Sequence, residues 1–206
     1  MKQEFLKHYE AVEGEAKRRI KDFEKLKKAS NKELFEELTF CVFAANSSAE
    51  MGLVAVELLK PVLEKGTLED YKERVHKKVR FYNKRAEYLY YNREKLKELN
   101  TDLKTIIKKE PEEKRQFIKQ NLKGFGMKET SHFLRNTGTK GLCIIDKHVL
   151  EVMLELKVIK KTDTPSNEEK YKDLEKKIIK FANKNNLDID ILDLAAWSYK
   201  TGKIIK

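Results

Sequence analysis

The amino-acid sequence predicts an all-α fold for this chain of 206 residues. Only eight glycines and three prolines interrupt it, whereas a β-rich chain of this length needs many turn residues. Apolar residues recur at spacings of three and four along most of the chain, as on the buried face of a helix. Charged residues (38%) and apolar residues (40%) are both abundant, which suits amphipathic helices around a sizeable core.

The first half of the chain is predicted to contain a series of helices. A charged amphipathic helix is expected over residues 4–28. Ser30 and Glu33 then have the spacing of a capping box, so the next helix is expected over 32–45. This helix is apolar on most sides toward its end, which predicts a place in the centre of the core. Further helices are expected over 49–64, 68–78 and through residue 88 to 99.

The second half continues the helical pattern. Pro111 suits the first position of a helix and separates two short helices, 101–109 and 112–121. The remaining helices are expected over 128–136, 147–156, 168–183 and 189–200. A short apolar run, 142–145, leads to Asp146 at the start of the helix that begins at residue 147.

The charge balance favours a polyanionic partner. The net charge is +11 and the pI is about 9.4. A surface rich in lysine and glutamate is also typical of heat-adapted proteins. Exchange between these two residue types alone, however, does not account for a net charge of +11. Nucleic acid is therefore the favoured partner.

The two cysteines and the absence of long apolar runs limit the classes of protein to which this chain can belong. Cys41 and Cys143 lie in apolar segments and are expected to be buried, reduced thiols. Two cysteines cannot build a four-cysteine zinc or iron–sulfur site, and no metal or other cofactor is expected. With neither an apolar signal core nor a run of about 18 apolar residues, a soluble cytoplasmic protein is expected.

A turn with two glycines joins two predicted helices. The pattern of helix, Leu-Lys-Gly-Phe-Gly, helix is typical of a helix–hairpin–helix motif, over about residues 112–136. Gly124 and Gly126 would let backbone N–H groups point at a DNA phosphate beside Lys123, while Phe125 packs inward. The alternative is an ordinary connection between helices with an incidental surface lysine.

Lys128 and Asp146 form the candidate catalytic pair. A helix start is an unfavourable place for the Lys128 ammonium, and a lysine must be neutral to act as a nucleophile. The start of the next helix stabilises the Asp146 carboxylate. An amine and a carboxylate suit covalent chemistry at a sugar C1′, with the carboxylate supporting the oxocarbenium-like centre. Taken alone, Asp146 is better explained as a helix cap.

Three segments resemble the archaeal-type 8-oxoguanine DNA glycosylase/lyases, a branch of the helix–hairpin–helix glycosylase superfamily. They are residues 124–136, 144–148 and 192–197, and the resemblance extends over nearly the whole chain, including 40–46 and 80–88. It implies one glycosylase domain over residues 1–206, built from two helical subdomains with the active cleft between them. The expected partner is double-stranded DNA containing 8-oxoguanine, bound by a monomer.

The resemblance also implies residue roles. Lys128 matches the Schiff-base lysine and Asp146 the catalytic aspartate, so that base removal is followed by β-elimination. The damaged nucleotide is expected to turn out of the duplex into a pocket formed with Phe81, Trp197 and Lys206. Two other hypotheses are a non-catalytic DNA-binding module, in which Lys128 only touches phosphate, and a glycosylase for another damaged base.

Overall fold

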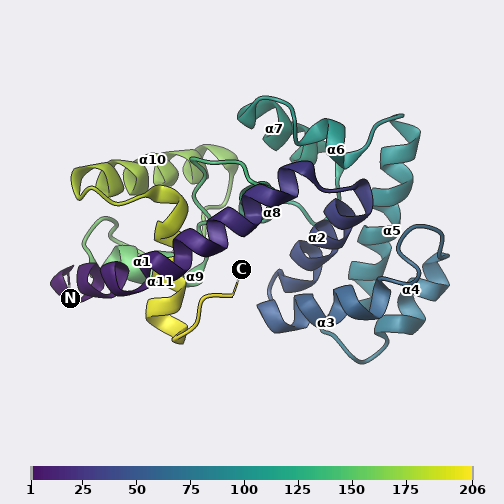
Figure 1. The fold of residues 1–206 in the computed structure, drawn as a ribbon, viewed down its shortest axis with the longest axis horizontal. Coiled ribbons are helices and arrows are strands. Elements are labelled where there is room, and N and C mark those ends of the chain that lie inside the picture. Colours follow the sequence, from purple (N-terminus) through teal and green to yellow (C-terminus); the bar gives the residue numbers. More distant parts are fainter. Residues whose placement is uncertain (1, 206) are drawn as a thin grey trace. The chain divides into compact units, whose positions relative to one another are not determined.

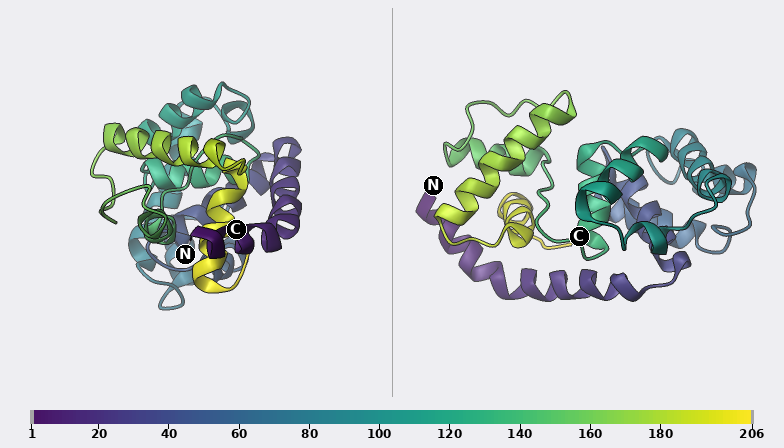
Figure 2. Two further views of the ribbon diagram at one scale, coloured as in Figure 1. Left: turned by 90° about the vertical axis from the view of Figure 1, so that its left-hand side faces the viewer. Right: turned by 90° about the horizontal axis from the view of Figure 1, so that it is seen from above.

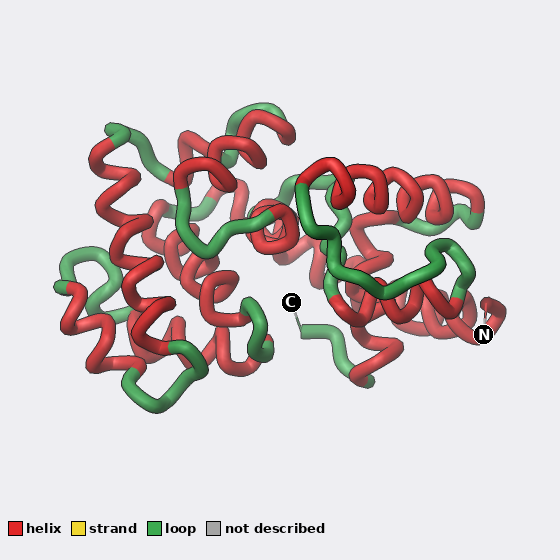
Figure 3. Tube along the Cα trace, turned by 180° about the vertical axis from the view of Figure 1, so that it is seen from behind, coloured by secondary structure: helices red, strands yellow, loops and turns green. Residues whose placement is uncertain are grey.

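The computed structural model describes residues 2–205, and every regular element within them is helical (Figures 1 and 3). This confirms the predicted all-α class. None of the described helices is long and apolar enough to cross a membrane. The elements are α1 (Lys2–Lys25), a 3-10 turn (Leu26–Lys28), α2 (Asn31–Ala44), α3 (Ala49–Leu59), α4 (Leu68–Val75), α5 (Tyr82–Glu98), α6 (Leu103–Ile106), α7 (Pro111–Asn121), α8 (Met127–Asn136), α9 (Lys147–Glu155), α10 (Glu168–Lys184) and α11 (Ile189–Thr201).

The chain forms two compact units, which are described separately below. Unit 1 comprises Met1–Phe23 and Thr139–Lys206, of which residues 2–23 and 139–205 are described. Unit 2 comprises Glu24–Gly138. Unit 1 is therefore built from both ends of the chain, and unit 2 is one continuous segment.

Helix α2 is the centre of unit 2, as its apolar sequence predicts. It packs against α3, α5, α6 and α8 (Figure 1). Its first turn has the predicted capping box, in which the Ser30 hydroxyl accepts from the Glu33 N–H and the Glu33 carboxylate accepts from the Ser30 N–H. Its buried residues are Leu34, Phe35, Glu37, Leu38, Thr39, Phe40, Cys41, Val42 and Phe43.

Two close contacts fix the neighbours of α2. A Cβ at Gly52 of α3 would lie only 2.8 Å from the Phe40 ring, so the missing side chain lets α3 approach α2 closely. On α8, the buried Asn136 amide donates to the Glu37 carboxylate at 2.6 Å. This hydrogen bond satisfies a buried carboxylate and ties the end of α8 to α2.

Unit 1 packs α9 and α10 against α11 (Figures 1 and 2). The N-terminal part of α1 joins them through Phe5, whose ring meets that of Tyr199 edge to face at 5.6 Å. On the same helix, His8 is hydrogen-bonded to the buried Ser198 hydroxyl at 2.7 Å. Both predicted buried cysteines are confirmed as free buried thiols, Cys41 in unit 2 and Cys143 in unit 1.

Three predicted helices are longer than those observed. The segment 49–64 is helical only to Leu59, since Pro61 has no N–H to continue the hydrogen-bond ladder. The segment 68–78 stops at Val75, because His76 leaves the helical conformation and Lys77 has a positive φ of 55°. The segment 101–109 forms only the short α6.

Candidate functional site

The structure confirms only part of the backbone geometry that the two glycines predict for the turn between α7 and α8. Gly124 has a φ of +85°, in the left-handed region, whereas Gly126 has a φ of −81° and is the N-cap of α8. Both residues are exposed, and Phe125 between them is buried with its ring edge to face with Phe133. The turn thus exposes its glycine backbone and anchors itself through the phenylalanine, as predicted.

Helix α5 supports this turn through three side chains. The side-chain NH₂ of Asn92 donates to the backbone carbonyl of Lys123 at 3.0 Å, and the side-chain oxygen of Asn92 accepts from the backbone N–H of Lys123 at 2.7 Å. A Cβ at Gly124 would lie 3.1 Å from the Tyr88 ring, and the Lys123 ammonium lies 3.8 Å from the centroid of the Tyr91 ring. The backbone of the turn therefore lies directly on α5.

Asn92 is a supporting residue that the sequence analysis missed. It is fully buried, on the same face of α5 as Ala86, Leu89 and Leu96. An asparagine on the apolar face of an amphipathic helix was a usable signal, because a buried amide requires hydrogen-bond partners. The partner itself could not be read from the pattern.

Lys128 lies at the second helical position of α8, after Met127. Its side chain is about one-third exposed, and its Nζ lies 3.3 Å from the Glu129 carboxylate. The buried Arg115 of α7 donates to the Ser131 hydroxyl at 2.8 Å and so fixes α8 against α7. An accessible amine is thereby held beside the partial positive charge of a helix start.

Asp146 follows a segment that has no regular secondary structure but is held in place by hydrogen bonds. Residues 142–145 are buried without forming a strand. The Tyr171 hydroxyl donates to the Cys143 carbonyl at 2.7 Å, and the Glu175 carboxylate accepts from the Cys143 N–H at 3.1 Å. Asp146 then caps α9, with Oδ1 accepting from the Val149 N–H at 2.8 Å. This confirms the predicted helix start and orients the carboxylate.

Trp197 lies close to the first turn of α9. Its ring meets the His148 ring edge to face, with the centroids 6.3 Å apart. Lys200, on the next turn of α11, forms an ion pair with Glu155 of α9. Asp146 and Trp197 are therefore presented by two helices that are packed and paired within unit 1.

Phe81 is an exposed aromatic residue in a strained conformation. It is 56% exposed, has a φ of +54° and is the N-cap of α5. The guanidinium carbons of Arg80 and Arg85 lie 4.9 and 5.4 Å from its ring centroid. Arg85 is itself buried and donates to the carbonyls of Phe43 and Ala45, and burial lowers its pKa. The combination of a large exposed aromatic ring and a positive φ keeps Phe81 as a candidate for a functional role.

The predicted site residues fall into two groups. Unit 2 holds Phe81 at the start of α5 and Lys123, Gly124, Gly126 and Lys128 in and after the turn that α5 supports. Unit 1 holds Asp146 and Trp197. Lys206 lies outside the described residues. No group of three or more metal-ligating side chains occurs within residues 2–205.

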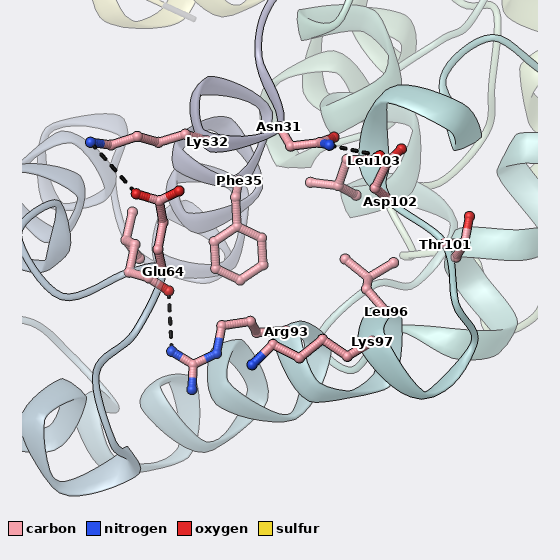
Figure 4. Close-up of a pocket in the computed structure, with 11 residues that line it drawn as sticks. Asn31, Lys32, Phe35, Glu64, Arg93, Leu96, Lys97, Thr101, Asp102 and Leu103 are labelled. Atoms are coloured by element: carbon pink, nitrogen blue, oxygen red, sulfur yellow. Dashed lines mark hydrogen bonds and ion pairs between the residues drawn. The ribbon is translucent and has the colours of Figure 1, made fainter.

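An open pocket of about 230 Å³ lies elsewhere in unit 2 (Figure 4). Its apolar floor includes Phe35, and its rim carries the Lys32–Glu64 pair and the hydrogen bond from Asn31 to Asp102. None of the predicted site residues within the described part of the chain lines it. Its lining residues are Asn31, Lys32, Phe35, Leu63, Glu64, Arg93, Leu96, Lys97, Thr101, Asp102 and Leu103.

Comparison with known proteins gives consistent matches. A family model described as 8-oxoguanine DNA glycosylase matches residues 16–187. A curated 8-oxoguanine DNA glycosylase/AP lyase of Methanocaldococcus jannaschii is 35% identical over 196 residues, covering 92% of this chain and 90% of the relative. A protein of the same name from Thermotoga maritima is 35% identical over 210 residues, covering 99% and 100%.

Two solved structures have the same fold. The crystal structure of the 8-oxoguanine DNA glycosylase of Thermotoga maritima superposes with a TM-score of 0.89 at 33% identity, covering 99% of this chain and 97% of that one. The Methanocaldococcus jannaschii 8-oxoguanine glycosylase/lyase in complex with a 15mer DNA containing 8-oxoguanine gives a TM-score of 0.88 at 32% identity, covering 98% and 99%.

Proposed function

Because this chain belongs to the 8-oxoguanine DNA glycosylase family, we propose that it is a bifunctional DNA glycosylase/AP lyase that excises 8-oxoguanine and then nicks the strand. The observation that carries this proposal is an accessible amine, Lys128, at the start of the helix that follows an exposed glycine turn. The relative solved with DNA containing 8-oxoguanine supports DNA with this lesion as the partner, and we propose that this DNA is double-stranded.

Lys128 is proposed as the nucleophile. Its neutral amine attacks C1′ while the bond from C1′ to the base breaks, and the base leaves with the electron pair and takes up a proton. The attached amine loses both protons, the bond from C1′ to the ring oxygen breaks so that the oxygen leaves with the electron pair and takes up a proton, and an imine remains between Lys128 and C1′. Removal of a C2′ proton then forms a double bond between C2′ and C3′ while the C3′–O bond breaks and the phosphate leaves with its electron pair, which nicks the strand on the 3′ side.

Asp146 is proposed to stabilise positive charge at C1′ as the base leaves. Asp146 lies at the N-cap of α9, where the hydrogen bond from the Val149 N–H fixes the orientation of its carboxylate. A fixed anion near a developing oxocarbenium ion lowers the energy of the transition state more than that of the ground state. The mechanism requires that Asp146 and Lys128 act on the same sugar.

The glycine turn is proposed to hold DNA independently of its sequence. The exposed backbone of Gly124 and Gly126 would donate to a phosphate, with the ammonium of Lys123 beside it. Base recognition is assigned to Phe81, Trp197 and Lys206. Since more than half of Phe81 is exposed, Phe81→Ala is expected to reduce release of 8-oxoguanine with little change in the free energy of unfolding.

Borohydride trapping tests the covalent mechanism. The intact protein is expected to form a reduced protein–DNA adduct on duplex containing 8-oxoguanine, and Lys128→Gln is expected to form none. Lys147→Gln is the matched control, because Lys147 is also a lysine in the first turn of a helix and is 81% exposed. Absence of an adduct with the intact protein, or an adduct that persists in Lys128→Gln, would contradict the mechanism.

The same assay on other lesions tests the substrate. Adducts are expected to be strongest with 8-oxoguanine in a panel that includes oxidised pyrimidines and mismatched bases. A stronger reaction with another lesion would move the assignment to that base. We further propose that the enzyme acts inside the cell on chromosomal DNA, and that it acts as a monomer. Light scattering at assay concentration would contradict the monomer if it gave twice the mass of the 24.3 kDa chain.

A further inference from the structure

One face of α5 continues the exposed surface of the glycine turn. Lys84, Tyr88 and Tyr91 are spaced by four and three residues, so they share one side of the helix. The turn lies against the same side, with Gly124 on the Tyr88 ring and the Lys123 ammonium over the Tyr91 ring. We call Lys84 and Tyr88 the α5 patch.

The α5 patch combines an exposed cation with a hydroxyl donor. The Lys84 side chain is 65% exposed, and its ammonium lies 5.4 Å from the centroid of the Tyr88 ring. Glu87 lies 3.5 Å from Lys84 but also 3.6 Å from Lys72, so two ammonium groups share one carboxylate. No described residue forms a hydrogen bond with the Tyr88 hydroxyl. The patch therefore carries a positive charge that its neighbours do not cancel.

The position of the patch along α5 places it between two proposed contacts with DNA. Phe81, proposed to face the extruded base, starts the helix, and the turn rests on Tyr88 seven residues later. At about 1.5 Å per residue these positions are roughly 10 Å apart along the helix axis. Each DNA strand carries one phosphate per about 3.4 Å of duplex axis. A strand that runs along α5 from one contact to the other would bring a further phosphate past Lys84 and Tyr88.

We propose that Lys84 and Tyr88 form an additional subsite for a backbone phosphate, between the turn and the base contacted by Phe81. The Lys84 ammonium and the Tyr88 hydroxyl donate to the phosphate oxygens. Because a phosphate carries no base identity, the subsite contributes equally to damaged and undamaged duplex. This inference rests on the proposed function in placing the damaged base at Phe81 and a DNA phosphate at the glycine turn.

The salt dependence of binding to undamaged duplex tests the subsite. Each phosphate contact adds about 0.9 to the slope of log affinity against log salt concentration. Lys84→Ala is expected to reduce that slope by about one. Between 50 and 200 mM salt the intact protein should therefore lose about 3.5-fold more affinity than the variant. Tyr88→Phe keeps the ring under Gly124 and removes only the hydroxyl, and it is expected to weaken binding at every salt concentration.

Lys97→Ala is the matched control on the same helix. Lys97 is 60% exposed and pairs with Glu94 three residues away, as Lys84 pairs with Glu87, but it lies on the opposite side of α5. The slope of log affinity against log salt concentration for Lys97→Ala should equal that of the intact protein. Equal slopes for Lys84→Ala and Lys97→Ala, or unchanged affinity in Tyr88→Phe, would overturn the subsite. Because no base is excised in this experiment, a failure of borohydride trapping would leave its outcome unaffected, and the two proposals fail separately.

Discussion

Asn92 of α5 holds both backbone groups of Lys123, donating to its carbonyl at 3.0 Å and accepting from its N–H at 2.7 Å. The Asn92 side-chain amide therefore makes the pair of hydrogen bonds with the Lys123 backbone that a neighbouring β-strand would make. It fixes the backbone just before Gly124, where the turn reaches positive φ. The shape of the exposed turn consequently depends on a buried side chain 31 residues earlier in the chain.

Replacing Asn92 with alanine is expected to destabilise the protein by about 1–3 kcal/mol, since it leaves two backbone groups of Lys123 without their partner. Urea unfolding measures the loss. DNA affinity should also fall under conditions in which the variant is folded, because the turn loses its support. Asn121→Ala is the control: Asn121 lies at the end of α7 beside the turn but makes one local hydrogen bond, to Phe117, so its loss should be smaller.

The two glycines of the turn are expected to respond differently to alanine. Gly124→Ala forces a Cβ into the left-handed region and to 3.1 Å from the Tyr88 ring, which should cost about 1–2 kcal/mol of stability. Gly126→Ala has an ordinary φ, and its nearest contact is 3.4 Å from Glu129, so only the lower preference for alanine at an N-cap opposes it, and the loss of stability should be smaller than for Gly124→Ala. Thermal unfolding of both variants checks this order, and the reverse order would refute it.

Asp146 offers a way to separate helix capping from chemistry. Asn caps a helix as well as Asp does, so Asp146→Asn should keep the hydrogen bond from Val149 and the fold. Loss of the anion is expected to slow base release by about 10²- to 10³-fold, with DNA affinity nearly unchanged. Single-turnover excision measures this rate.

Asp146→Ala provides the comparison for the capping role. It should lose about 1 kcal/mol of stability in addition to activity, because the first N–H groups of α9 lose their cap. If Asp146→Asn released the base at the rate of the intact protein, the carboxylate would have only the capping role.

His8 is expected to make unit 1 less stable in acid. Burial lowers the pKa of His8, with an opposing effect from the hydrogen bond to the Ala195 backbone. The unfolded chain, with a His pKa of about 6.5, therefore binds a proton at a higher pH than the folded protein does. Stability should be unaffected by His8 above that value and should fall as the pH drops from about 6.5 toward the lower folded pKa.

Urea midpoints measured between pH 7.5 and 5.5 check this dependence. His8→Gln, which retains a polar side chain near Ser198 and has no titrating group, should reduce the fall. A fall of the same size in both proteins would assign the acid sensitivity to other groups.

Local chemistry made much of the fold predictable. The capping box at Ser30, the proline at the start of α7 and the cap at Asp146 each act within one turn of helix, so their spacing alone marks a helix start. The buried Phe125 followed from the motif in the same way. Helix ends were less predictable. Val75 ends α4 because the backbone turns at His76 and Lys77, which no strong breaker in the sequence marks.

The sequence by itself determined the helices and the exposed glycine turn, and through the family resemblance it supplied the proposal that Lys128 and Asp146 carry the chemistry. Only the tertiary structure decided what holds them: Asn92 behind the turn, Tyr171 and Glu175 behind the segment before Asp146, and His148 against Trp197. The physical reason is the range of the interactions. Periodicity and caps record contacts within a few residues of the chain, whereas the partner of a buried amide or carboxylate is fixed by how separate helices pack.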